Sequence, residues 1–262
     1  MPDTKMTNSQ FGEIAKTGQA AWLTALFCVL FFLSAVSAHC SENLSADRIF
    51  SCSGDGGAIS CGHPAAAKIA VEILKQGGNA VDAAVAASFM LGVVDFSNSG
   101  IGGDGFALVH SPNGSIVAFD GSTRRPGLEK QKILNYAGLP TLPEMLLKLL
   151  RLYGHKSPAE VMAPAIKACL EGFKVSSYLE RVVEKKLLNC KDPATTAFLA
   201  PDGYPLRAGQ IFKQPVLART LLQMATDGGR SFYRGDEARK TLADLQKKGS
   251  AYQPEDFARY RS

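Results

Sequence analysis

The sequence lacks several patterns that mark particular classes of protein. Its 262 residues contain no internal repeat and no low-complexity tract, which excludes a repeat array. Basic residues are scattered, apart from pairs such as Arg124-Arg125 and Lys185-Lys186, and the net charge is only +5. A nucleic-acid-binding face is normally a concentrated basic stripe or patch. We therefore predict that no nucleic acid is a partner of this chain.

Metal sites and histidine-based catalysis also have little support. The six cysteines follow no spacing that is typical of a metal site. His63, His110 and His155 are isolated in the sequence, and no Ser-His-Asp arrangement is readable around them. His63 directly precedes an expected helix, where a local cap or a surface position is the simpler interpretation. The sequence therefore predicts no metal ligand and no histidine catalyst.

The cysteines bear instead on possible disulfides. Cys28 lies within an apolar segment, and five others lie beyond it: Cys40, Cys52, Cys61, Cys169 and Cys190. An oxidising compartment permits disulfides, but an odd number of cysteines leaves one unpaired. Cys169 lies on the apolar face of an expected helix, so we expect it to be a small buried hydrophobic residue.

The most apolar part of the chain is residues 20–38, which read AAWLTALFCVLFFLSAVSA without a charge. This length approaches the roughly 20 apolar residues that span a bilayer. It also resembles the apolar region of a signal peptide, with Val36-Ser37-Ala38 as a cleavage site. The tail at residues 1–19 carries no net basic charge, which favours a signal anchor slightly over a signal peptide. Either way, we expect a membrane-anchored or secreted protein whose remaining chain lies on the non-cytosolic side.

Residues 39–59 are polar and contain serine and glycine, so we expect a linker there and a folded domain over residues 60–262. Pro64 suits the first position of a helix. Apolar residues then recur with helical spacing until Gly77-Gly78, which is typical of a helix C-terminus. Of the chain as a whole, 46% is apolar and 20% is charged, as in ordinary globular proteins.

A second helix is expected over residues 80–94, which are nearly all apolar and rich in alanine. Asn79 can cap this helix, and Asp82 would lie in its first turn, where a carboxylate is favourable. A helix that is apolar on all sides is buried. Because the segment is too short to span a membrane, we expect it to lie in the core.

A hairpin is expected next, with strands over residues 106–110 and 115–120. Between them, Pro112-Asn113-Gly114 is typical of a tight turn, since asparagine and glycine accept a positive φ. We expect the apolar FALV and IVAF runs of the two strands to be substantially buried. A polar connection over residues 121–143 follows.

The second half of the chain is expected to be mainly helical. Ser157-Pro158-Ala159-Glu160 forms a capping box with proline at the first helical position, and the helix that it starts ends at Gly172. Glu255-Asp256 would lie in the first turn of a final short helix. The remaining helices are expected over residues 145–153, 216–226 and 237–247.

Gly100 to Gly105 match the spacing G-x-G-x-x-G of dinucleotide-binding loops. That mechanism requires a strand before the loop and a helix after it. Here the expected order is the reverse, so the dinucleotide interpretation is disfavoured. Two others remain open: a tight turn with close backbone packing, and a turn whose N–H groups line an anion pocket. Asp104 within the turn either contacts a ligand or stabilises the turn.

Several blocks together resemble the γ-glutamyltransferase family of N-terminal-nucleophile hydrolases. The first block is Pro64–Val109, from PAAAKIAVEILKQGGNAVDAAVA to SGIGGDGFALV. The others follow in the family's order over the rest of the chain: Gly154–Val175, Phe198–Gly229, Ser231–Ser250 and Tyr252–Ser262. The resemblance covers the whole expected domain, residues 60–262.

The resemblance implies a fold and a chemistry. The fold is α+β, a partial αββα sandwich to which this stretch contributes outer helices and a hairpin. Members of the family are precursors that cleave themselves before a threonine. Its side chain is then the nucleophile and its α-amino group the base that removes a γ-glutamyl group from glutathione or a related amide. No metal and no organic cofactor is implied.

Two departures qualify what this chain can do. The family's threonine falls beyond Ser262, and Thr195-Thr196 lies too early to replace it, so we predict no catalytic residue within this chain. We expect the 262-residue chain to lack the small subunit, to be inactive alone, and to be marginally stable. Missing strands would also leave sheet edges and apolar faces uncovered.

The second departure concerns the substrate. Family members typically carry an Arg-Glu-Thr-Ala-Pro-like segment whose arginine binds the substrate α-carboxylate, which a guanidinium can do bidentately. Here the segment reads DGSTRRP, and Ser122 stands at that position. The pattern is more similar to an acylase branch with an arginine at the position of Arg124, our predicted substrate contact. Two alternatives stay open: an amidohydrolase that acts on another small acid amide, and a membrane-tethered relative without catalysis.

Overall fold

The computed structural model describes residues 50–54, 56–123, 138–187 and 203–261. All of them belong to one of the two units of the chain, residues 47–262. The apolar segment at residues 20–38, the tail before it and the linker up to residue 49 lie outside the described residues. No helix in the described ranges is long and apolar enough to cross a membrane.

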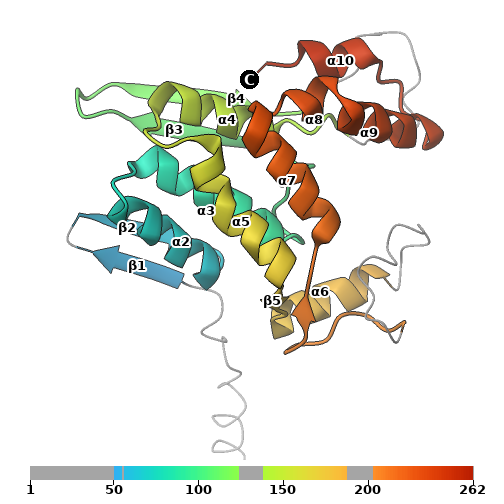
Figure 1. Cartoon of the computed structure of the whole chain (residues 1–262), viewed down its shortest axis with the longest axis horizontal. Coiled ribbons are helices and arrows are strands. Elements are labelled where there is room, and N and C mark those ends of the chain that lie inside the picture. The colour runs from blue at the N-terminus through green and yellow to red at the C-terminus, as the bar shows by residue number, and fades with distance from the viewer. Residues whose placement is uncertain (1–49, 55, 124–137, 188–202, 262) are drawn as a thin grey trace, which may run out of the picture. The chain divides into compact units, whose positions relative to one another are not determined.

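Helix α3 (Ala80–Val94) lies at the centre of the described fold (Figure 1). It packs against α2 (Pro64–Lys75), α4 (Leu142–Tyr153) and α5 (Pro158–Glu171). Ten of its fifteen residues are buried, which confirms the expected core position. The expected burial on all sides is wrong, because one side of the helix carries the exposed Ala80 and Ala84.

The boundaries of α2 and α3 follow from the local sequence. Pro64 stands at the start of α2, and Gly77 has φ +82°, a conformation that favours glycine and ends the helix. Asn79 and Asp82 form a reciprocal capping box at the start of α3. These caps confirm the prediction made from the sequence.

Asp82 also joins α3 to a distant part of the chain. Its side chain is fully buried and accepts hydrogen bonds from the backbone N–H groups of Asn79, His155 and Lys156 at 2.8–3.1 Å. The Asn79 side chain adds a bond to the carbonyl oxygen of Tyr153 at the end of α4. A buried carboxylate is tolerated only when such donors satisfy it. The α2–α3 turn is therefore fastened to the α4–α5 connection.

A hairpin precedes α2, where the sequence suggested a linker up to residue 59. Strands β1 (Phe50–Gly54) and β2 (Gly57–Cys61) pair antiparallel and pack against α2. The described fold therefore begins before Ser60. The alternating pattern was weak because β2 exposes most of its side chains, and Ile59 and Cys61 alone in this strand are half-buried.

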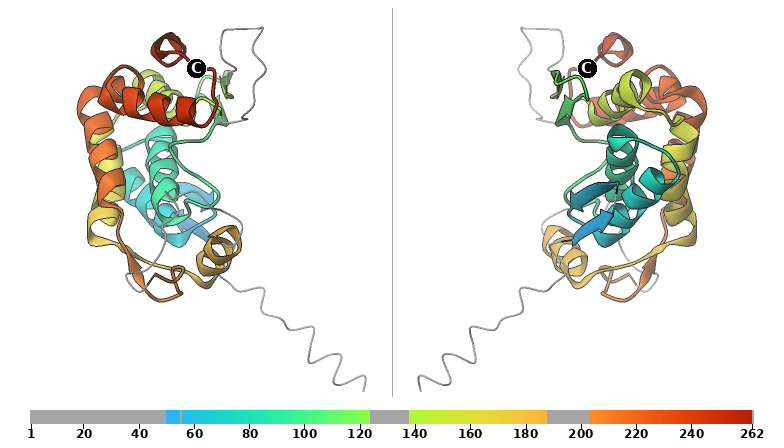
Figure 2. Two further views of the ribbon diagram at one scale, coloured as in Figure 1. Left: turned by 90° about the vertical axis from the view of Figure 1, so that its right-hand side faces the viewer. Right: turned by 90° about the vertical axis from the view of Figure 1, so that its left-hand side faces the viewer.

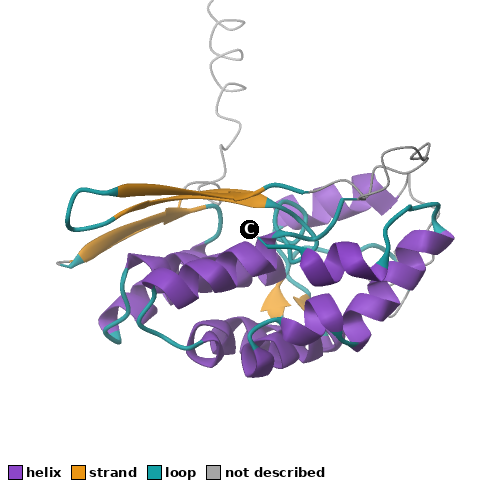
Figure 3. Ribbon diagram, turned by 90° about the horizontal axis from the view of Figure 1, so that it is seen from above, coloured by secondary structure: helices purple, strands orange, loops and turns teal. Residues whose placement is uncertain are grey.

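The predicted central hairpin consists of β3 (Gly105–His110) and β4 (Ile116–Gly121), paired from Gly105–Gly121 to His110–Ile116. Its turn and register agree with the prediction, but the expected burial of both apolar runs is wrong. Phe119 is buried, and Ala107, Val109 and Val117 are half-buried against the core. Side chains alternate across a strand, so their neighbours point away from the core. Figure 3 shows the strands on one side of the helices.

Glycine allows helix α4 to cross the end of this hairpin closely. A Cβ atom at Gly121 would lie 2.7 Å from the sulfur of Met145 in α4 and 2.8 Å from the carbonyl oxygen of Gly105. Such distances are shorter than van der Waals contact, so no larger residue fits without a shift. The end of β4 is thus held directly against α4.

The second half of the chain is mainly helical, as predicted. Helices α5 and α7 (Pro215–Asp227) run side by side (Figure 2). The sequence analysis missed the short or polar elements, which bury few side chains: α6 (Ser177–Leu187), α8 (Arg230–Arg234), β5 (Phe173–Lys174) and β6 (Ile211–Phe212). It anticipated α9 (Asp236–Lys247) within one residue. It also placed Glu255-Asp256 in the first turn of a final short helix, which is α10 (Pro254–Arg259).

Candidate functional site

The candidate site is the place where three distant segments meet, which we name the strand-end junction. It comprises Gly103 and Asp104 of the glycine-rich turn, Gly121–Thr123 at the exit of β4, and Leu139–Leu142 at the start of α4. The glycine-rich turn follows helix α3 and precedes strand β3. This order confirms that the turn is not a dinucleotide loop, since no helix begins at its end.

Thr141 belongs to the third segment of the junction, and its hydrogen bonds hold the other two segments together. The N–H groups of Thr141 and Leu142 both donate to the carbonyl oxygen of Gly103 at 3.0 Å. The fully buried Thr141 hydroxyl donates to the carbonyl oxygen of Gly121 at 2.5 Å. One threonine therefore holds both the glycine-rich turn and the end of β4.

Thr123 is fixed from two sides. Its backbone N–H donates to Asp104 Oδ2 at 3.3 Å, and its hydroxyl donates to the carbonyl oxygen of Leu139 at 2.9 Å. Asp104 thus stabilises the exit of β4, in addition to its place in the turn. Thr123 directly precedes Arg124, which itself lies outside the described residues.

Two tyrosines complete the junction, Tyr233 of α8 and Tyr252 of the connection between α9 and α10. The Tyr252 hydroxyl accepts from the N–H of Leu139 at 2.9 Å. The Tyr233 hydroxyl donates to the carbonyl oxygen of Pro140 at 2.8 Å and accepts from the N–H of Glu144 at 3.1 Å. Residues separated by up to 113 positions in the sequence are therefore bonded here.

Burial alters the titration of groups at this junction. Loss of solvent raises the pKa of the Tyr233 hydroxyl, and it does the same for Tyr252. Burial also raises the pKa of the Glu144 carboxyl, although Arg151, Arg261 and Lys148 oppose this effect. Both tyrosines consequently stay protonated at neutral pH and act as hydrogen-bonding supports.

The described part of the junction contains no complete catalytic set. Ser122 donates its hydroxyl and its N–H to Asp120 Oδ1, so the serine faces a carboxylate without an intervening histidine. Nowhere in the described ranges do three or more histidine, cysteine or acidic side chains gather to hold a metal ion.

The other predicted residues lie apart from the junction. His63 caps α2, accepting from the N–H of Ala65 at its Nδ1 atom, as expected. His110 ends β3, and His155 lies in the α4–α5 connection. Asp256 belongs to a capping box with Gln253 at the start of α10, as predicted. Thr195-Thr196, like Arg124, falls outside the described residues.

Cysteine chemistry has no place at the junction. Cys169 is fully buried in α5, which confirms the expected role as a small hydrophobic residue, and burial raises its pKa to about 11. Cys61 is half-buried, with its thiol close to the carbonyl oxygen of His63. Both are free thiols. A thiol with so high a pKa is mostly protonated and is a poor nucleophile.

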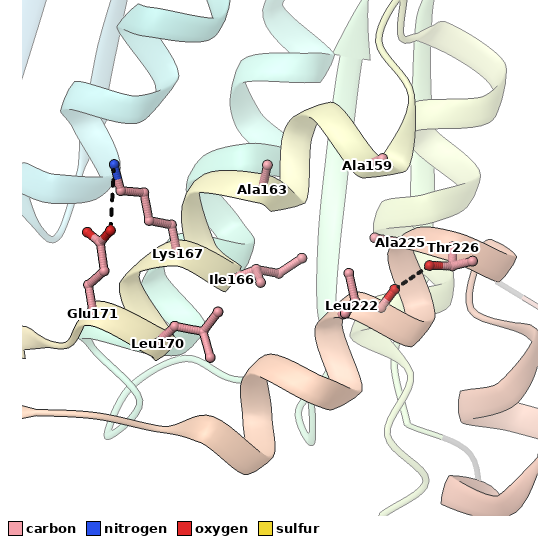
Figure 4. A pocket seen from close by; sticks show the side chains of 9 residues that line it. All are labelled: Ala159, Ala163, Ile166, Lys167, Leu170, Glu171, Leu222, Ala225 and Thr226. Carbon is pink, nitrogen blue, oxygen red and sulfur yellow. Dashed lines mark hydrogen bonds and ion pairs between the residues drawn. The ribbon is translucent and has the colours of Figure 1, made fainter.

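A groove between α5 and α7 also lacks catalytic character (Figure 4). Ala159, Ala163 and Leu170 of α5 line it with Leu222 of α7. Its charged residues, Lys167 and Glu171, pair with each other at 3.9 Å. Because a chemical site requires convergent polar groups, this apolar groove is not a candidate active site.

Sequence reasoning missed the residues that build the junction. Thr141 belongs to no motif, and the partners of Thr141, Tyr233 and Tyr252 are remote in the sequence. The two tyrosines lie in blocks that carry the resemblance, but no role was predicted for either. The signal that pointed to this region was the glycine-rich turn and the DGSTRRP segment. These two segments meet through Asp104 and Thr123.

Comparisons with known proteins agree with the resemblance. The family profile described as gamma-glutamyltranspeptidase matches residues 66–262. The chain is 32% identical to glutathione hydrolase proenzyme 2 of Schizosaccharomyces pombe, over 91% of this chain and 40% of that protein. It therefore spans about two fifths of the length of this curated relative.

Solved structures show the same similarity. The gamma-glutamyltranspeptidase of Helicobacter pylori matches with a TM-score of 0.74 and 31% identity, over 80% of this chain and 65% of that one. A cephalosporin acylase from Bacillus halodurans matches with a TM-score of 0.66 and 31% identity, over 75% of this chain and 40% of that one. The helix-rich α+β fold agrees with the predicted fold class.

Proposed function

Because the chain belongs to the gamma-glutamyltranspeptidase family, we propose that it is the N-terminal part of a γ-glutamyl hydrolase or transferase. Its substrates are γ-glutamyl amides such as glutathione. The observation that carries the proposal is the match of residues 66–262 to the family, together with the well-supported exit of β4 directly before Arg124.

Arg124 supplies the substrate contact in this proposal. Its guanidinium binds the α-carboxylate of the γ-glutamyl group, a charge-assisted and bidentate pairing. Asp104, Thr123 and Thr141 hold the preceding backbone, which supports a defined starting point for this side chain. The nucleophilic threonine and the small subunit lie outside the 262 residues, so the chain by itself binds without turning over.

An acylase on another small acid amide is the second candidate. Two observations favour it: Ser122 stands where typical members carry arginine, and the cephalosporin acylase is among the similar structures at 31% identity. The two candidates differ in whether the α-amino group of the substrate is required. A glutaryl amide keeps the carboxylate but lacks this amine, so it separates them.

Residues 20–38 place the protein at a membrane in this proposal. Their length and lack of charge support a signal anchor or a signal peptide, with the described unit on the non-cytosolic side. Detection of residues 20–38 in the mature protein by mass spectrometry would support the anchor. A mature N-terminus at His39 would support the signal peptide.

Ligand binding tests the proposal without the missing nucleophile. The full chain is purified in a mild detergent, and glutathione binding is measured by calorimetry. We expect Arg124→Gln to weaken binding about 10–100-fold, as for the loss of a charged hydrogen-bonding partner. Arg125→Gln is the matched control and leaves affinity unchanged. Absence of glutathione binding, or an equal loss in both variants, contradicts the proposal.

Activity provides the second test. The chain and the product of any in-frame extension of its coding sequence are assayed with a γ-glutamyl amide and with the matching glutaryl amide. Turnover of the γ-glutamyl amide that requires a downstream threonine supports a γ-glutamyl enzyme. Preference for the glutaryl amide supports the acylase, and binding without turnover in either form supports a non-catalytic relative.

A further inference from the structure

The turn of the β3–β4 hairpin contains a sequence that is typical of glycan attachment. The acceptor pattern for N-linked glycans is asparagine with serine or threonine two positions later and no proline between them. The 262 residues contain this pattern twice, at Asn43-Leu44-Ser45 and at Asn113-Gly114-Ser115. The first lies outside the described residues, so the structural argument concerns Asn113.

The turn presents Asn113 to solvent. The N–H of Gly114 donates to the carbonyl oxygen of Ser111 at 2.9 Å, and the N–H of Ser111 donates to the carbonyl oxygen of Ser115 at 2.9 Å. Gly114 has φ +84°, which a glycine adopts without strain. Asn113, Gly114 and Ser115 are all exposed. Because these bonds lie within residues 111–115, the shape of the turn is set locally.

The side chain of Asn113 leaves its amide nitrogen available. Its Oδ1 atom accepts hydrogen bonds from the N–H of Ser115 at 3.0 Å and from the Ser115 hydroxyl at 2.7 Å. A carboxamide also carries two N–H donors on its nitrogen. Among the described residues, the Nδ2 atom of Asn113 donates to no partner. Nδ2 is the atom to which an N-linked glycan is attached.

We propose that Asn113 is an N-glycosylation site. This inference rests on the proposed non-cytosolic location, where an oligosaccharyltransferase would meet the chain. The donor is an oligosaccharide linked to a polyprenyl diphosphate. Nδ2 forms a bond to the anomeric carbon of the first sugar, and the bond between that carbon and the diphosphate oxygen breaks. The polyprenyl diphosphate leaves, and one Nδ2 proton passes to a base of the transferring enzyme.

A glycan on this turn would leave the candidate site open. The strand pairs run from Gly105–Gly121 at the strand-end junction to His110–Ile116 at the turn. The five steps from Gly105 to His110, at about 3.4 Å each, place the turn roughly 17 Å from the junction. A Cβ atom added at Gly114 would meet no atom within 4 Å. The turn therefore has room for a bulky, solubilising group.

Translation of the full chain in the presence of microsomal vesicles tests the inference. The vesicles supply the oligosaccharyltransferase and its lipid-linked donor. We expect a chain that is protected from added protease and that moves faster on a gel after an endoglycosidase removes its glycans. Asn113→Gln and Ser115→Ala should each lose one glycan, whereas Ser115→Thr keeps the hydroxyl and should retain it. Asn98→Gln is the matched control, because Asn98 is exposed but does not begin an acceptor pattern.

The variant Asn43→Gln separates the two acceptor patterns, because any glycan that it carries is attached at Asn113. A protected Asn43→Gln chain without a glycan overturns the inference and leaves the proposed location intact. A chain that the protease degrades fully contradicts the proposed location and the inference with it.

Mass spectrometry distinguishes glycosylation from spontaneous deamidation of the Asn113-Gly114 sequence. Enzymatic release of a glycan in heavy-oxygen water converts Asn113 to aspartate that carries the heavy isotope. Deamidation before release gives aspartate without the isotope. Labelled aspartate at residue 113 supports the inference, whereas unlabelled aspartate or unchanged asparagine overturns it.

Discussion

Helix α3 and the β3–β4 hairpin are neighbours in the sequence and are similarly apolar, yet their surroundings differ. Helices α2, α4 and α5 cover most of α3, and the exposed residues of this helix are the small Ala80 and Ala84. The hairpin is covered on the side of Phe119 and open on the side of Leu108, where large apolar side chains are exposed. The described residues thus cover the helix more fully than the hairpin.

This difference shows that the two regions depend on different partners. The helical layer is held by contacts within the chain, including the bonds of Asp82 to the α4–α5 connection. The hairpin has an apolar side that no described element uses. Substitutions at buried positions of the helical layer should therefore affect folding, whereas those at the exposed Phe106, Leu108 and Ile116 should have little effect on it.

The largest effect is expected at Asp82, which fastens the helical layer. Asp82→Ala leaves the N–H groups of Asn79, His155 and Lys156 without their acceptor. At about 1–3 kcal/mol for each buried unpaired group, the free energy of unfolding should fall by about 5 kcal/mol. Urea unfolding measures the change, and the exposed Asp244→Ala is the control.

A fall of less than about 1 kcal/mol in Asp82→Ala would mean that water or other groups replace the carboxylate. In that case the stability of the helical layer would not depend on the hydrogen bonds that Asp82 accepts. The comparison with the hairpin would then rest on apolar packing alone.

The two sides of the hairpin permit a direct comparison. Phe119→Ala removes a buried aromatic ring and should lower the free energy of unfolding by about 3–5 kcal/mol. Leu108→Ala removes an exposed side chain and should change it by less than about 0.5 kcal/mol. Chemical unfolding measures both losses. Equal losses in both variants would show that Leu108 is covered.

Helix α7 offers the same comparison at adjacent positions. Leu221 is fully buried against α5, whereas Leu222 is 56% exposed beside the groove. Leu221→Ala should cost about 2–4 kcal/mol and Leu222→Ala less than about 0.5 kcal/mol. Thermal unfolding of both variants measures the two losses of stability. A large cost for Leu222→Ala would reveal that something occupies the α5–α7 groove.

The smallest effect concerns pH. Hydrogen bonds from the N–H and hydroxyl of Ser157 hold the pKa of the Glu160 carboxyl below its usual range. A lowered folded-state pKa adds stability above the unfolded value of about 4.3, and acidification removes it as the pH falls through the folded pKa. In Glu160→Gln, the melting temperature should therefore decrease less than in the wild type when the pH is lowered from about 5 to 3. An unchanged decrease would mean that the cap does not depend on charge.

The local sequence predicted those elements whose limits are encoded nearby. Pro64, the Asn79–Asp82 box and the Ser157–Glu160 box all fixed helix starts correctly. The Asn113-Gly114 turn likewise fixed the hairpin. In contrast, α6 was missed because Leu179 and Val183 are its only buried residues, too few for a clear helical pattern.

The candidate site was predictable only in part, for a physical reason. The glycine-rich turn and the segment before Arg124 stand out by composition, whereas their supports do not. Thr123 bonds Leu139 sixteen residues away, and Leu139 bonds Tyr252 from the far end of the chain. Such tertiary bonds leave no local pattern. The role of Arg124 remains a prediction that the binding experiment addresses.

The bond between Leu139 and Tyr252 has a consequence for biosynthesis. The two residues are separated by 113 positions, and a ribosome adds about 5–20 residues each second. The glycine-rich turn and the exit of β4 therefore wait roughly 6–23 s for their last support to be translated. During this interval the N–H of Leu139 lacks its tyrosine partner, and the bonds of Thr141 and Asp104 alone hold the exit of β4.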